Sequence, residues 1–158
     1  MKTIREQIIE LIIARLETIT TTNGYENTIG IGCVYREEAV IKQGLAPAIS
    51  VWELSEIRQR NNYGGTVRTL TIKIEGAVEV NGDKHPATAS NQLLGDIERA
   101  LILRDTNLDA FIDDIQDIAA EIAQITSLQN NTTLAGATID FEIQYTTEWG
   151  DPYTQQKM

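Results

Sequence analysis

Few residues of this sequence have the type and spacing that enzyme chemistry requires. His85 is the only histidine, and it precedes Pro86 in a predicted turn, where an exposed imidazole is far more common than a general base. No G-x-S-x-G elbow is present to position a nucleophile. The run Ile29-Gly30-Ile31-Gly32 lacks the third glycine of a dinucleotide-binding motif, and no G-x-x-x-x-G-K-[ST] occurs. We therefore expect a protein that is not an enzyme and binds no cofactor.

Four aspartates could be considered as metal ligands, namely Asp109, Asp113, Asp114 and Asp117. On a helix, acids at this spacing without a spaced loop or a histidine partner usually form a solvated face. Cys33 is the only cysteine, which excludes an intrachain disulfide and a thiolate metal cluster. The sequence therefore predicts no metal site.

Charge is distributed unevenly along the chain. There are 23 acidic and 13 basic residues, and the net charge of −10 opposes the phosphate contacts on which nucleic-acid affinity mostly depends. From Asp105 to Glu121 there are six acids and no base, whereas four bases and no acid lie from Arg58 to Lys73. Two such patches on opposite sides of a domain would let copies meet head to tail and close a ring. The alternative is that both patches are ordinary solvated surfaces.

The elements that must carry these residues follow from hydrophobic periodicity. Thr3-Ile4-Arg5-Glu6 matches a capping box, and helical apolar spacing continues to about Thr18. A second helix is predicted from Ala87 to Leu103. β-Branched, aromatic and alternating apolar residues predict strands over residues 29–35, 48–57, 66–80 and 139–146.

The remaining segments are turns or ambiguous. Asn61–Gly65 is predicted to be a mobile tip between two strands that form a long ribbon, and Asn81-Gly82 is predicted to turn the chain. The spacing of apolar residues from Leu108 predicts a helix to about Asp117. Residues 118–128 fit either a helix or a hairpin. Residues 154–158 are expected to be a flexible tail.

Together these elements predict a single α+β domain over residues 1–158, with a mainly antiparallel β-sheet and a long β-ribbon. Two or three helices should pack on its one apolar face, and the other face should be polar. No apolar run approaches the roughly 20 residues of a membrane span, so we expect a soluble protein without a membrane partner. The predicted core comprises Ile8, Ile12, Leu16, Leu70, Ile72, Ile74, Leu94, Ile97, Leu101, Phe141 and Ile143.

The closing segment Ile139–Pro152, with the sequence IDFEIQYTTEWGDP, combines an alternating strand, a Tyr-Thr pair and a Gly-Asp-Pro turn. With the N-terminal helix REQIIELIIARLETI and the strand AISVWEL, it resembles the tail terminator, or tail completion, proteins of tailed bacteriophages. The resemblance covers the whole chain as an order of elements, whereas the residue-level motif is short.

The resemblance implies a virion protein, made in the host bacterial cytoplasm, that forms a ring, expected to be a hexamer, on the tail tube. Such a ring ends tube polymerisation and provides the head–tail joining surface. The implied partners are other copies of the chain, the major tail-tube protein, a neck or connector protein, and the sheath protein if the tail contracts. DNA passes through the lumen without specific binding.

The family offers no catalytic motif to transfer, so candidate assembly contacts come from the ribbon tip and the charge pattern. They are Arg58, Arg60, Asn61, Asn62, Tyr63, Arg68, Asp109, Asp113, Asp114 and Asp117. A head-completion or neck connector protein accounts for the same elements and is the main alternative. A small non-viral adaptor or a ligand-binding domain is a further alternative.

Overall fold

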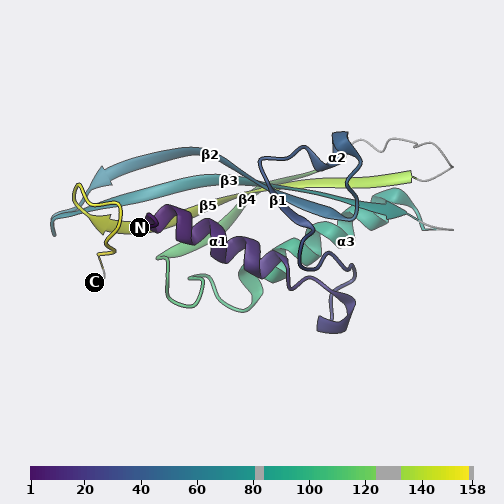
Figure 1. The fold of residues 1–158 in the computed structure, drawn as a ribbon, viewed down its shortest axis with the longest axis horizontal. Helices are drawn as coiled ribbons and strands as arrows, with labels where there is room; N and C mark the ends of the chain where they lie inside the picture. The colour runs from purple at the N-terminus through teal and green to yellow at the C-terminus, as the bar shows by residue number, and fades with distance from the viewer. Residues whose placement is uncertain (81–83, 124–132, 157–158) are drawn as a thin grey trace.

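The computed structural model describes residues 1–80, 84–123 and 133–156 (Figure 1). The sheet has five strands in the order β1-β2-β3-β5-β4, in which β1 is parallel to β2 and all other neighbours are antiparallel. The elements in chain order are α1 (Ile4–Leu16), η1 (Thr21–Asn23), β1 (Val34–Arg36), α2 (Val40–Gln43), β2 (Ala48–Arg60), β3 (Gly65–Val80), α3 (Pro86–Glu98), η2 (Arg99–Leu103), β4 (Asp114–Ala123) and β5 (Thr133–Glu148). This mixed sheet with three α-helices confirms the predicted α+β class.

The two long helices lie on one face of the sheet, as Figure 1 shows, and the short helix α2 lies against the other. The expectation of two or three helices on one face is met by α1 and α3, whereas α2 is a helix that the sequence did not predict. A small second apolar cluster forms beneath it, because Val40 of α2 packs on Ala48 and Ala77 of the sheet. We refer to this second side of the sheet as the open face.

Both long helices begin at side-chain caps. The hydroxyl of Thr3 accepts a hydrogen bond from the Glu6 N–H at 3.1 Å, as the capping-box pattern predicted. His85 caps α3, since its Nδ1 accepts from the Ala87 N–H at 3.0 Å, and Pro86 follows at the first helical position. The only histidine thus has a structural partner in the backbone.

The β2–β3 ribbon and β5 form the centre of the sheet. Leu70, Ile72 and Ile74 are fully buried on the helix side, while their neighbours in the chain face the other way. A Cβ added at Gly76 would lie 2.9 Å from Cδ2 of Leu93, so this glycine allows α3 to approach the sheet closely. The predicted core is confirmed except that Leu94 is only partly buried.

A β-bulge interrupts β2. Glu53 pairs with Ile72 and Glu56 pairs with Leu70, so three residue steps on β2 match two on β3. The bulge accommodates this extra residue, so that both glutamates lie on the helix side of the sheet. In a regular strand, two residues three positions apart would point to opposite faces.

Two predicted elements are wrong. The strand predicted over residues 29–35 is reduced to Val34–Arg36, because Gly30 and Gly32 adopt positive φ angles of 78° and 89°. The helix predicted from Leu108 to about Asp117 does not form, since residues 108–110 have positive φ and β4 begins at Asp114. The ambiguous stretch 118–128 is strand as far as Ala123. Its remainder and the turn at Asn81-Gly82 lie outside the described residues.

Candidate assembly surface

The tip of the ribbon is braced by residues from the C-terminal segment. The side-chain oxygen of Asn61 accepts from the N–H groups of Tyr63 and Gly65, both at 2.9 Å. The Asn61 amide also donates to Oε1 of Gln156 at 2.7 Å, and Nε2 of Gln156 donates to the Tyr63 carbonyl at 2.7 Å. The ribbon tip and the C-terminal segment as far as Gln156 thus satisfy polar groups of each other. The mobility predicted for the tip and for the tail from about residue 154 stays a prediction.

A second set of contacts ties this end of the sheet together. The Trp149 N–H donates to the Gly64 carbonyl at 2.9 Å, and the Arg60 guanidinium stacks on the Trp149 ring. The Ile4 N–H at the start of α1 donates to the Pro152 carbonyl at 2.9 Å. The ribbon tip, the turn after β5 and the start of α1 thus form one unit, which lies near the chain termini at the left in Figure 1. We call the ribbon tip and the C-terminal segment of this unit, residues 60–65 and 149–156, the tip cluster.

The tip cluster presents aromatic side chains to solvent. Tyr63 is 70% exposed and Trp149 is 59% exposed, and Tyr153 and Asn62 are also exposed. Aromatic residues are enriched in the cores of protein interfaces because they bury large areas with few rotatable bonds. A fixed group of exposed aromatic residues at one end of a domain indicates a contact surface.

Next to the tip cluster, Glu56 organises a buried ionic group. Its side chain is 4% exposed and lies 2.6 Å from Nε of Arg58 and 3.6 Å from Arg68, and it accepts a hydrogen bond from the Tyr145 hydroxyl. Burial by itself raises the pKa of the Glu56 carboxyl, but the hydrogen bonds from Tyr145 and Arg58 and the charges of Arg58 and Arg5 outweigh it, so the pKa lies below its usual value. Arg68 is buried here, which corrects its assignment as a surface contact.

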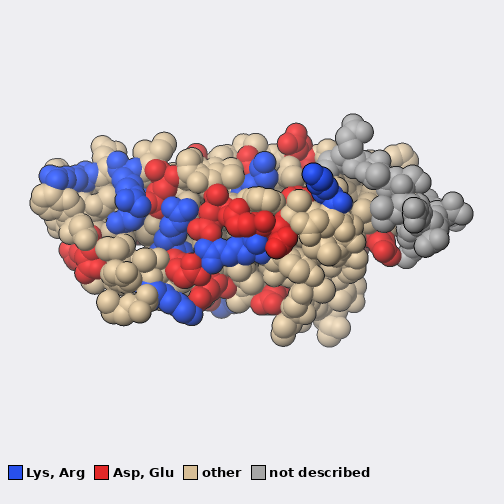
Figure 2. Space-filling model, turned by 45° about the horizontal axis from the view of Figure 1, so that its top comes forward, with Lys and Arg blue, Asp and Glu red and all other residues tan. Residues whose placement is uncertain are grey.

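A second ionic group joins α1 to the sheet. The guanidinium of Arg36 lies 2.7 Å from Glu6 and 2.5 Å from Glu53, and Arg5 lies 3.1 Å from Glu53. The hydrogen bond from Arg36 lowers the pKa of Glu6. Figure 2 shows basic and acidic side chains side by side along the middle of the molecule, as such paired groups require.

The acidic segment divides into two parts. Asp105 lies 3.0 Å from Arg15, and Asp109 lies 3.4 Å from Arg15 and 2.6 Å from Arg104. Both carboxylates form ion pairs within the domain, and the hydrogen bond from Arg15 lowers the pKa of Asp105. Asp109 is therefore not a free acidic contact.

The other aspartates lie at the edge of the sheet, on or beside β4. Asp113 accepts from the Thr146 hydroxyl at 2.7 Å, while Asp114 and Asp117 are exposed on opposite faces of the strand. Within the described residues, these three carboxylates have no basic group within 4 Å. The exposed bases of the ribbon and the exposed acids of β4 thus lie at opposite edges of the sheet, as head-to-tail contact requires.

The open face of the sheet is strongly acidic. The strand register places one basic residue of the described strands, Lys73, on this face. The acids on the same side are Glu75, Glu79, Asp114, Glu121, Asp140, Glu142 and Glu148.

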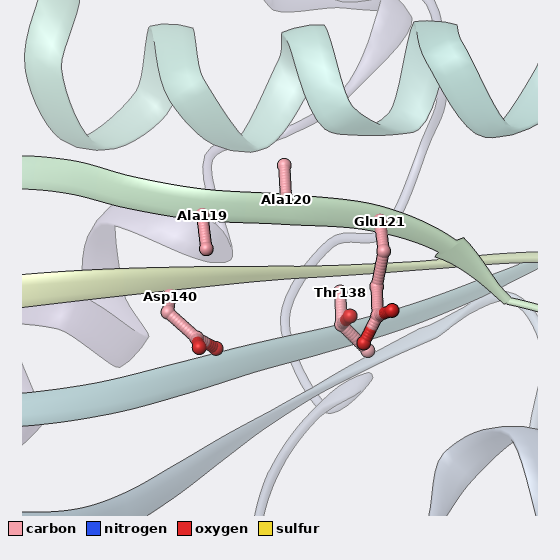
Figure 3. A pocket seen from close by; sticks show the side chains of 5 residues that line it. All are labelled: Ala119, Ala120, Glu121, Thr138 and Asp140. Atoms are coloured by element: carbon pink, nitrogen blue, oxygen red, sulfur yellow. The ribbon is translucent and has the colours of Figure 1, made fainter.

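A shallow hollow of about 190 Å³ lies on this face between β4 and β5. In Figure 3 the carboxylates of Glu121 and Asp140 point to the same side as Thr138, whereas Ala120 points toward the helix. Two carboxylates and a hydroxyl do not form a nucleophile–base pair. In the described parts of the chain, no group of three or more His, Cys, Asp or Glu side chains is placed to hold a metal ion.

No protein-family model matches the chain, and no curated protein matches it significantly. None of the described helices is both long enough and apolar enough to cross a membrane. The surface contacts of the domain are therefore the basis for a functional proposal.

Sequence reasoning placed Asn61, Asn62 and Tyr63 correctly at the ribbon tip. It missed the contributions of Trp149 and Gln156 to that site. The tryptophan could have been found from its place in the aromatic turn after the last strand, whereas nothing local in the sequence marks Gln156 as a partner of Asn61.

Proposed function

We propose that this protein is a non-catalytic virion subunit that forms a ring, expected to be a hexamer, on the end of a bacteriophage tail tube. The ring ends tube polymerisation and provides the surface to which the neck of the filled head is joined. The observation that supports this most directly is the tip cluster, an end of the domain at which two chain segments are joined by hydrogen bonds and a cation–π contact and present exposed aromatic side chains.

A ring subunit must contact two different neighbours through two different surfaces. Exposed bases at the ribbon edge and exposed acids at the β4 edge meet this condition, because like edges repel and unlike edges attract. An isologous dimer would need one self-complementary patch instead. The charge arrangement therefore favours head-to-tail assembly.

The open face supports the passage of DNA. If the sheets stand side by side around an axis with the two long helices α1 and α3 outside, the seven acids and one lysine of the open face line the central channel together with α2. A polyanion is repelled by such a wall instead of being held by it. The proposed protein partners are the tail-tube protein, a neck or connector protein and, in a contractile tail, the sheath protein. DNA passes through the channel without being bound.

The proposal is tested by the mass of the purified protein in solution. Light scattering after size exclusion is recorded over a wide concentration range at two salt concentrations, with and without the tail-tube protein of the same phage. A discrete hexamer, or a monomer that becomes a hexamer on adding tube protein, is the expected result. A twelve-fold ring would indicate the connector instead. A monomer indifferent to tube protein under every condition would overturn the proposal.

A further inference from the structure

Both edges of the sheet have unpaired backbone groups. In the part of the chain that the structure describes, β4 pairs only with β5, and β2 beyond Trp52 pairs only with β3. The short strand β1 covers β2 only at residues 49–51. A free strand edge is a template for another strand, and proteins usually cover or shorten such edges. Here one free edge runs along Leu54–Arg60 and the other along Gln116–Ile122, since the Ile115 N–H already donates to the Thr106 carbonyl at 3.0 Å.

Each free edge also carries apolar side chains that are exposed to solvent in the monomer. On β4, Ile118 is 46% exposed, and Ile122, Ala119 and Ala120 are exposed as well. On β2, Ile57 is 73% exposed. Adding a strand would shield part of this apolar surface while satisfying the backbone groups.

Charge determines which edges can meet. If two β4 strands paired, Asp114 and Glu121 of both copies would share the open face and the two Asp117 side chains would share the helix side, which brings like charges together and is unfavourable. The exposed charges of the ribbon edge are Arg58 and Arg60, because the carboxylate of Glu56 is buried. Arg58 and Arg60 lie on the helix side of the sheet, as Asp117 does, so the β4 edge suits the ribbon edge of a second copy better than another β4.

Strand direction agrees with this pairing. Three successive antiparallel pairings, β2 with β3, β3 with β5, and β5 with β4, make β2 and β4 run in opposite directions. A rotation about a ring axis preserves the direction of each strand relative to that axis. The β2 edge of a second copy would thus meet β4 in the antiparallel sense.

We propose that the outer edge of β2 in one copy, Leu54–Arg60, adds to β4 of the next copy, Gln116–Ile122, as an antiparallel strand. The partner is a second copy of this chain, and the contact is heterologous, so each copy offers both edges. This inference rests on the proposed ring and specifies its subunit interface. The result is a sheet that continues from copy to copy.

Disulfide trapping tests this contact. In a Cys33→Ser background, Ile57→Cys or Gln59→Cys on β2 is combined with Gln116→Cys or Ala119→Cys on β4, since all four side chains lie on the open face. Within one copy the two edges are separated by three strand spacings, about 14 Å, which is too far for a disulfide. After mild oxidation, at least one combination should give a ladder of cross-linked species up to the ring number, and the single-cysteine variants should not.

A matched control pairs Gln116→Cys with Thr71→Cys, which lies on the open face but on the central strand β3. It should give no ladder. Rings seen by light scattering without a ladder in any of the four combinations would overturn the strand pairing and leave the ring proposal standing. Self-cross-linking of a single-cysteine variant would show an isologous contact and also overturn the inference. Absence of any ring, with or without tube protein, would overturn the proposed function itself.

Discussion

The guanidinium of Arg60 lies over the indole ring of Trp149, 3.5 Å from its centroid. This contact joins the end of β2 to the turn after β5. A cation–π contact at an exposed site is worth about 0.5 to 1 kcal/mol, so it stabilises the tip cluster without dominating it. Arg60 therefore has a role inside the monomer as well as a place at its surface.

Replacing Trp149 should loosen the tip cluster selectively. We expect Trp149→Ala to lower the free energy of unfolding by about 1 kcal/mol and to speed amide hydrogen exchange at Tyr63 and Gly65. Trp149→Phe should have a smaller effect because it keeps an aromatic face. Unchanged exchange at the tip in Trp149→Ala would show that the hydrogen bonds of Asn61 are sufficient to hold it.

The double variant Arg58→Glu with Arg60→Glu should weaken ring or tube contacts while the monomer stays folded. The melting temperature of this double variant should also fall, because a new carboxylate at position 58 would lie beside Glu56. Assembly is measured by light scattering and folding by circular dichroism. Lys42→Glu with Lys84→Glu makes the same charge change away from the tip and serves as the control. Intact assembly with an intact spectrum would exclude these arginines as contacts.

Gly76→Ala should destabilise the domain by about 1 to 3 kcal/mol, because the new methyl would lie 2.9 Å from a side-chain atom of the fully buried Leu93. Combining it with Leu93→Val should cost less than the sum of the two single changes. Urea unfolding of the four proteins of this double-mutant cycle gives the coupling. Simple additivity would show that helix α3 shifts to accept the methyl.

Asp96 holds the loop after α1 to helix α3. Its buried carboxylate accepts hydrogen bonds from the backbone N–H groups of Glu26 and Asn27, at 3.0 and 2.9 Å, and from the side-chain amide of Asn27 at 2.9 Å. Asp96→Ala leaves these donors without an acceptor and should lower stability by about 3 kcal/mol. Asp96→Asn keeps one acceptor and should cost less. Equal thermal stability of the two variants would contradict this assignment.

Stability should fall in acid. Glu6, Glu56 and Asp105 have pKa values below their usual range in the folded protein, so the folded state binds fewer protons than the unfolded state. Their contribution is complete above the ordinary carboxyl pKa and is lost as the pH falls through the folded-state values. Urea unfolding from pH 7 to pH 3 should show this decline. Glu56→Gln should make the decline shallower, and an identical slope would exclude Glu56 as a source.

The strands that could be predicted from the sequence are those with one buried and one solvated face. Ile139, Phe141 and Ile143 alternate with polar residues because one face of β5 is buried in the core beneath α3 and the other is the open face. The edge strand β4 could not be recognised in this way, since a bulge at Ile118 shifts the alternation and makes the isoleucine spacing look helical. Ion pairs between distant parts of the chain could not be predicted either, because nothing in the local sequence marks Arg68 as buried beside Glu56.

The bulge between Glu53 and Glu56 sets the phase of the whole ribbon end. Because side chains alternate with a period of two, deletion of Ser55 would leave two residue steps on β2 opposite two on β3, and Glu56 would still pair with Leu70. Arg58 and Arg60 would then stay on the helix side of the sheet, and Ile57 and Gln59 would stay on the open face. The same single-codon deletion within the regular stretch that follows Glu56 would instead exchange the two sides of every later residue of β2, so the bulge is the position of this strand that tolerates the loss of a residue.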